Sequence, residues 1–90
     1  MKVRVQVTVH GRVQGVAYRY YTRLRALELG VNGWVRNVPD GSVEGLFEGD
    51  GPDIKTLVEW CSSGPPAARV EHVDVRDGVY CGEFEDFRIT

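Results

Sequence analysis

The most constraining feature of this sequence is the strict alternation over residues 2–10, KVRVQVTVH. Every second position is a valine, and an extended chain places alternate residues on one face. The opposite face carries only polar and charged residues: Lys2, Arg4, Gln6, Thr8 and His10. A period of two with β-branched residues on the apolar face predicts a strand with one buried side. The valine face needs a covering layer, which predicts a two-layer fold.

Two later segments, residues 18–29 and 50–64, have the period of a helix. Gly30 is well placed to end the first helix in the left-handed conformation. In the second helix, Pro52 suits the first helical position and Asp53 suits the positive end of the helix dipole. Apolar residues three or four apart predict one buried face for each helix. These faces are Ala17, Tyr20, Tyr21, Leu24 and Leu27 in the first, and Ile54, Leu57, Val58 and Cys61 in the second.

Four more segments have strand character: residues 31–38, 42–49, 69–77 and 84–90. Pro39 to Gly41 is a turn signal that makes the first two a hairpin. In the segment 69–77, Val73 and Val75 share one face, expected to be buried. No linker or repeat interrupts the chain, so residues 1–90 are expected to form one domain.

The order of these elements is β-α-β-β-α-β plus a short final strand. This order predicts the α+β class, and within it a ferredoxin-like two-layer sandwich. Two helices would then cover one face of an antiparallel sheet. Many unrelated activities use this fold, so the fold alone does not fix a function.

The charged residues are unevenly distributed, although the net charge is only −2. No acidic residue occurs from Met1 to Leu27, and all 13 carboxylate side chains follow from Glu28 onward. The basic residues of the first part are Lys2, Arg4, Arg12, Arg19, Arg23 and Arg25. Such a segment suggests an anionic ligand, but surface charge neutralised by the rest of the fold explains it equally well.

The stretch GRVQGVAYR, residues 11–19, joins the first strand to the first helix. The first N–H groups of a helix lack partners within it, and the helix dipole adds positive charge there. Gly11 and Gly15 permit backbone angles that let successive N–H groups curl around one point. Arg19, in the first helical turn, can present its guanidinium to the same point. These residues favour a phosphate cradle, although a plain strand-to-helix turn would use similar ones.

The predicted topology brings a second segment to this loop. The second strand runs back toward it, so that Arg36, Asn37 and Val38 arrive nearby. The Asn37 amide both donates and accepts hydrogen bonds and could hold a water molecule beside a phosphate. The alternative is that Asn37 caps the NVPDG turn, as asparagine often does.

GRVQGVAYR together with GVNGWVRNVPDGSVE, residues 30–44, resembles the paired motifs of the acylphosphatase family. The resemblance covers essentially the whole chain. It implies hydrolysis of acyl phosphates, mixed anhydrides of a carboxylic acid and phosphoric acid, by direct attack of water and without a metal or cofactor. It also implies that Arg19 binds the phosphate and that Asn37 positions the water. Backbone amides would complete the cradle, namely those of Gln14, Gly15, Val16, Ala17 and Tyr18.

Two departures from the family pattern are mild. Tyr18 stands where phenylalanine is commoner, and Val38 and Pro39 stand where some members carry hydroxyl residues. Neither removes a catalytic group. One alternative is a catalytically silent module that binds phosphate or acyl phosphate on the same fold. An RNA-binding module shares the element order, but the exposed face of the first strand has no aromatic residue on which a base could stack.

The expected partner is a small-molecule acyl phosphate, with inorganic phosphate or similar anions competing for the site. No nucleic acid or membrane partner is expected. No apolar run is long enough for a signal peptide or a membrane span, which predicts a cytoplasmic protein, and we expect a monomer. Cys61 and Cys81 lack the spacing of a zinc site and are interpreted as ordinary thiols, although the sequence leaves their pairing open.

Overall fold

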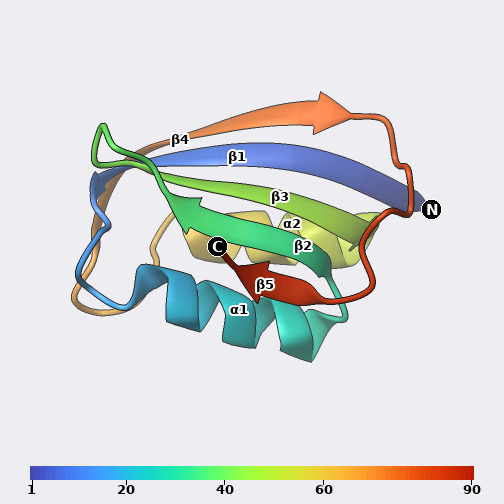
Figure 1. Ribbon diagram of the computed structural model, residues 1–90, viewed down its shortest axis with the longest axis horizontal. Helices are drawn as coiled ribbons and strands as arrows, with labels where there is room; N and C mark the ends of the chain where they lie inside the picture. The colour runs from blue at the N-terminus through green and yellow to red at the C-terminus, as the bar shows by residue number, and fades with distance from the viewer.

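The computed structural model describes all 90 residues and has the predicted order of elements (Figure 1). The boundaries lie within a few residues of those predicted. The elements are β1 (Lys2–Arg12), α1 (Tyr18–Leu29), β2 (Asn32–Asn37), β3 (Val43–Asp50), α2 (Gly51–Cys61), β4 (Arg69–Gly78) and β5 (Phe87–Ile89). Gly30 ends α1 in the left-handed conformation, as predicted, and Pro52 is the second residue of α2, one position later than predicted.

The strands form one sheet in the order β4-β1-β3-β2-β5. The first four strands are antiparallel to their neighbours, as expected, whereas β5 pairs in parallel with β2. Residues 79–86 carry the chain past one end of the sheet, from β4 at one edge to β5 at the other (Figure 1). Because β2 starts at that same end, β5 runs in the same direction as β2.

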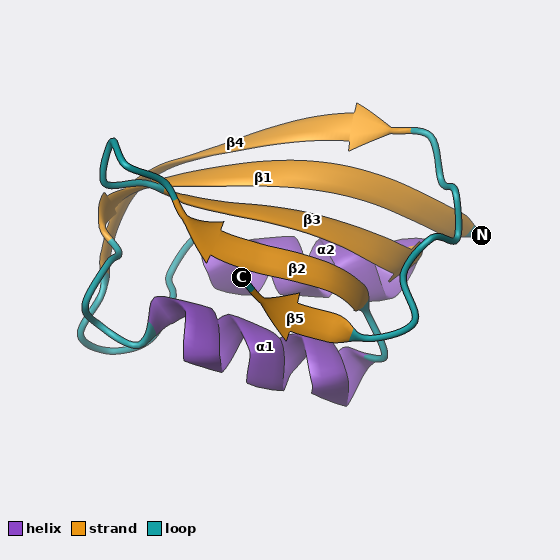
Figure 2. Ribbon diagram, in the orientation of Figure 1, coloured by secondary structure: helices purple, strands orange, loops and turns teal.

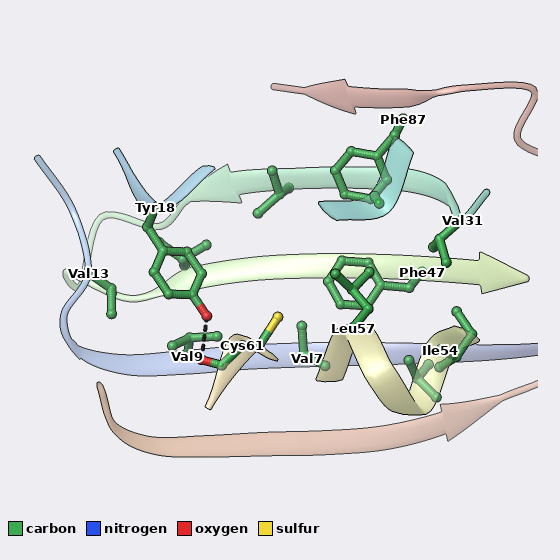
Figure 3. Close-up of a cluster of buried hydrophobic side chains, with 14 residues drawn as sticks. Val7, Val9, Val13, Tyr18, Val31, Phe47, Ile54, Leu57, Cys61 and Phe87 are labelled. Atoms are coloured by element: carbon green, nitrogen blue, oxygen red, sulfur yellow. Dashed lines mark hydrogen bonds between the residues drawn. The ribbon is translucent and has the colours of Figure 1, made fainter. Parts of the chain in front are cut away.

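Both helices cover one face of the sheet, so the fold is the predicted two-layer α+β sandwich (Figure 2). The core lies between the layers and contains the β1 valines Val5, Val7 and Val9, as the alternation predicts. Phe47 of β3 and Phe87 of β5 pack with their ring centroids 5.8 Å apart. The predicted α2 residues Ile54, Leu57 and Cys61 are buried against this group (Figure 3). Val58 is partly buried.

The predicted buried face of α1 is wrong. Tyr20, Tyr21 and Leu27 are 55%, 43% and 49% exposed, and the buried residues are Tyr18, Thr22 and Ala26. The cause is Tyr18, whose ring enters the core and whose hydroxyl donates to the Cys61 carbonyl at 2.6 Å (Figure 3). This contact fixes the rotation of the helix, so the positions four and eight residues later face inward.

The buried face of α1 escapes a hydropathy pattern because it is partly polar. Thr22 can be buried at little cost, since its hydroxyl donates to the Tyr18 carbonyl at 2.7 Å. The valine face of β4 is also less buried than predicted, with Val75 46% exposed. The helices pack mainly on other strands, α2 on β1 and β3 and α1 on β2 and β5, which leaves edge strand β4 poorly covered.

Cys61 is buried and Cys81 is exposed, and both are free thiols. Burial raises the pKa of Cys61 to about 12, so this thiol stays neutral. Neither helix is long and apolar enough to cross a membrane.

Candidate anion-binding site

A cavity of about 170 Å³ lies where β1 leads into α1 and where β2 ends. The β1–α1 loop and the start of α1 supply Gly15, Ala17 and Arg19 to its wall, and β2 supplies Asn37. Tyr18 also lines it, whereas Gln14 and Val16 of the predicted cradle do not. The structure therefore brings Arg19 and Asn37 to one cavity, as the topology predicted.

The loop backbone contains two closely spaced residues in the left-handed region. Gly15 has a φ of 74°, and Ala17, the residue before α1, has a φ of 63°. Ala17 is the only non-glycine residue of the chain with a positive φ. A Cβ added to Gly15 would meet nothing within 4 Å, so glycine is needed there for its backbone angle and not for space.

The backbone N–H groups from Gln14 through Tyr20 donate to no protein acceptor. The first turn of α1 has no side-chain cap and no acidic residue, so the positive end of the helix dipole is not neutralised locally. A run of free N–H groups at a helix start is a favourable environment for an anion.

Arg19 is half-buried in the cavity wall and pairs with no carboxylate. Where β1 begins, two basic residues of the first part of the chain are neutralised, Lys2 by Asp50 and Arg4 by Glu48 and Glu83. The surface-charge interpretation therefore holds where β1 begins. At the cavity it does not, because Arg19 remains free to bind an external anion.

The buried carbonyl oxygen of the Asn37 side chain, Oδ1, has no hydrogen-bond partner. The turn that Asn37 was expected to cap is closed by other groups. Val38 N–H donates to the Ser42 carbonyl at 2.9 Å, and Asp40 accepts from the Ser42 backbone N–H at 2.9 Å and from its hydroxyl at 2.6 Å. These bonds from Ser42 lower the pKa of Asp40. The capping interpretation of Asn37 is therefore wrong, and its oxygen is an acceptor in need of a donor.

Gln14 has a role that sequence reasoning missed. Its side-chain nitrogen Nε2 donates to the Val38 carbonyl at 2.7 Å and to the Ser42 carbonyl at 2.8 Å. These bonds tie the β1–α1 loop to the β2–β3 hairpin, which carries Asn37. No local pattern signals this contact, because the partners are backbone atoms more than 20 residues away.

The remaining polar groups near the loop do not supply an acid or a base. The Tyr18 side chain is 2% exposed, and burial raises the pKa of its hydroxyl, which stays protonated as a donor to Cys61. His10 lies outside the cavity wall and contacts Asp74, with Nε2 and Oδ2 3.2 Å apart. No group of three or more His, Cys, Asp or Glu side chains is arranged to hold a metal ion.

The fold and this cavity define a ferredoxin-like α+β domain with an arginine and free backbone amides at one end of its sheet. The acylphosphatase family model matches residues 5–89. An acylphosphatase from Syntrophus aciditrophicus is 55% identical over 89 residues, which are 99% of this chain and 93% of that protein. An acylphosphatase from Geotalea uraniireducens is 52% identical over 90 residues, 100% of this chain and 99% of that protein.

A solved structure supports the same assignment. The acylphosphatase from Coxiella burnetii superposes with a TM-score of 0.94 at 39% sequence identity, over 99% of this chain and 93% of that one. The chain belongs to the acylphosphatase family.

Proposed function

We propose that this protein hydrolyses the carboxyl–phosphate bond of small-molecule acyl phosphates, releasing a carboxylate and inorganic phosphate. Family membership supports the reaction class. The observation that carries the proposal is the convergence of an unpaired arginine and an unpartnered buried amide oxygen, Asn37 Oδ1, on one cavity. The guanidinium of Arg19 can hold a phosphate, and Asn37 Oδ1 can hold a water molecule beside it.

The phosphate group binds to the free amides of the β1–α1 loop and to the guanidinium of Arg19. A phosphoryl transfer needs positioning and charge stabilisation more than covalent help from the protein. The amides and Arg19 stabilise the negative charge that spreads over the phosphoryl oxygens in the transition state. In this proposal they take the part that metal ions play in kinases, and the reaction needs no metal or cofactor.

The nucleophile in the proposed reaction is water. Asn37 Oδ1 accepts a hydrogen bond from the water and orients its oxygen toward phosphorus. The new bond forms between the water oxygen and phosphorus, and the bond from phosphorus to the acyl oxygen breaks. The water proton passes to a phosphate oxygen, and the carboxylate leaves with the electron pair without needing a general acid. The loop has no Ser, Cys, His or carboxylate side chain, in agreement with a mechanism without a phosphoenzyme.

The experiment measures phosphate release from benzoyl phosphate with a chelator present, and competition by inorganic phosphate. Arg19→Ala is expected to lower kcat/KM by roughly 10³-fold or more and to abolish the competition. Asn37→Ala is expected to lose turnover while inorganic phosphate still binds, because the cradle is intact. Arg25→Ala, on the same helix but paired with Glu28, is the control and should behave as the wild type.

Two outcomes would contradict the proposal. Folded wild-type protein that binds phosphate but releases none from acyl phosphates would favour the silent binding module. Near-normal turnover in Asn37→Ala would remove Asn37 from the mechanism.

A further inference from the structure

Two apolar side chains with a large exposed area line the same cavity as Arg19 and Asn37. They are Tyr20 of α1, which is 55% exposed, and Ile89 of β5, which is 41% exposed. They come from opposite parts of the chain, and the pairing of β5 with β2 brings Ile89 to this end of the sheet. The cavity therefore combines the polar residues Arg19 and Asn37 with two exposed apolar side chains.

The fold gives no reason for an exposed aromatic ring at Tyr20. The buried face of α1 consists of Tyr18, Thr22 and Ala26, so the Tyr20 ring adds little to the core. The ring is nevertheless supported, because it meets the Tyr21 ring edge-on with the centroids 5.1 Å apart. A supported aromatic ring exposed beside a ligand cavity costs little entropy to use in binding.

Ile89 is also held in place. The β5 strand pairs Ile89 with Val35 of β2, and the next residue, Thr90, donates its backbone N–H to the Val35 carbonyl at 2.9 Å. The backbone that carries this side chain is therefore anchored on both sides of the residue.

The chemistry of an acyl phosphate places its acyl group near these side chains. One bridging oxygen separates the phosphorus from the carbonyl carbon, so a phosphate held by Arg19 and the loop amides leaves the acyl group within a few bonds of the cavity wall. The wall contains no carboxylate, and its only charged side chain is Arg19, which the phosphate occupies. An uncharged, apolar acyl group matches the uncharged part of the wall, which includes Tyr20 and Ile89.

We propose that Tyr20 and Ile89 form an acyl-recognition surface, which makes the enzyme favour acyl phosphates with an aromatic or bulky apolar acyl group over acetyl phosphate. The inference rests on the proposed function and deepens it, since it names the substrate class of the same site. The bound ring of such a substrate lies against the Tyr20 ring and removes apolar surface from water.

The test compares kcat/KM for benzoyl phosphate and acetyl phosphate in the wild type and in Tyr20→Ala. Truncation is expected to lower kcat/KM for benzoyl phosphate about five- to tenfold, the size expected from losing contact with part of one aromatic ring. The value for acetyl phosphate should change by less than about twofold. Because the two substrates differ in intrinsic reactivity, the readout is the change in their ratio on mutation, in which that difference cancels.

Three further proteins complete the experiment. Tyr20→Phe keeps the ring and is expected to keep the wild-type ratio. Ile89→Ala is expected to change the ratio in the same direction as Tyr20→Ala. Leu27→Ala removes another exposed apolar side chain of α1, away from the cavity, and should leave the ratio unchanged.

The outcomes separate this inference from the proposed function. An equal loss for both substrates in Tyr20→Ala, or an unchanged ratio in both truncations, overturns the acyl-recognition surface and leaves the hydrolase proposal standing. A wild-type protein that hydrolyses neither substrate overturns the proposed function and the inference with it.

Discussion

Ala17 shows how a single residue serves the site at a cost to stability. Its left-handed conformation brings the Cβ too close to the following carbonyl oxygen, which costs about 1–2 kcal/mol in a residue other than glycine. The strain lies at the last residue before α1, where the chain turns so that the free N–H groups adjoin the cavity. Backbone strain of this kind concentrates at functional sites.

Ala17→Gly is expected to raise the free energy of unfolding by up to about 1 kcal/mol, because glycine adopts the native φ without strain. The greater entropy of glycine in the unfolded chain offsets part of the gain. Ala26→Gly is the matched comparison, since Ala26 lies buried in the interior of the same helix, where the change should cost about 1 kcal/mol or more. Urea unfolding measures both, and destabilisation by Ala17→Gly would show that the conformation is not strained.

At this scale the sequence predicted that Arg19 and Asn37 lie close together, which the structure confirms, but not the hydrogen bonding around them. The motif and the strand direction placed both residues at one end of the sheet. The unpartnered Oδ1 of Asn37 could not be predicted, because it depends on Asp40 accepting the turn hydrogen bonds instead. Ala17 was expected on a helical apolar face, since a left-handed alanine leaves no mark in a hydropathy pattern.

At the scale of elements, the geometry of the site depends on how the β1–α1 loop meets the β2–β3 hairpin. The loop provides the amides that lead into Arg19, and the hairpin provides Asn37. The two bonds from the Gln14 side chain to the hairpin carbonyls join these elements directly. The distance between the loop amides and Asn37 matters for turnover, because a displacement of about 1 Å in a catalytic group can lower the rate roughly 10²-fold.

Gln14→Met keeps the length of the side chain and removes its donor. It is expected to lower kcat by about 10- to 100-fold through misplacement of Asn37, with a much smaller change in competition by inorganic phosphate. The loss of stability should be about 1–2 kcal/mol, because both carbonyls keep a backbone donor, Gly41 for Val38 and Val38 for Ser42. Gln6→Met in β1 removes a bond to Glu44 outside the cavity and serves as the control. Equal losses of turnover in the two variants would contradict a positioning role for Gln14.

The elements themselves were largely predictable from the sequence, and their packing was less so. The period of two in β1 and the glycine, proline and aspartate signals located the strands, helices and turns within a few residues. The buried face of α1 was wrong because Tyr18 sets the rotation of that helix through a tertiary contact with Cys61. The exposure of Val75 and the parallel pairing of β5 also depend on where distant elements pack.

At the scale of the whole molecule, an ion-pair cluster around the buried Glu48 connects the end of the sheet opposite the site to the segment that leads into β5. Glu48 of β3 is 3% exposed and accepts from the Cys81 N–H at 2.9 Å, from the Glu83 N–H at 3.2 Å and from Arg4 at 3.1 Å. The cluster anchors residues 81–83, and the chain from there leads to Ile89 at the cavity. Desolvation opposes the charge on Glu48, but these donors outweigh it and lower its pKa.

This cluster gives the stability of the protein a defined dependence on pH. Because the pKa of Glu48 is lower in the folded state than its ordinary value of 4.5, the carboxylate stabilises the fold above that value. The contribution is lost as the pH falls through the folded-state pKa. The Glu48 carboxylate is therefore expected to stabilise the folded protein at neutral pH and to lose this effect in acid.

Glu48→Gln is expected to lower the free energy of unfolding by about 2–3 kcal/mol at pH 7. The glutamine side chain has only one acceptor oxygen, so its NH₂ group must face at least one of the N–H groups that now donate to the carboxylate. Urea unfolding at pH 7 and pH 3 measures the difference between wild type and variant, which should shrink at pH 3 as the wild-type carboxylate protonates. Glu59→Gln, exposed on α2 and without an ion pair, is the control and should differ little from the wild type at either pH. If Glu48→Gln lowers the free energy of unfolding equally at both pH values, then packing, and not the charge, holds residues 81–83 against the sheet.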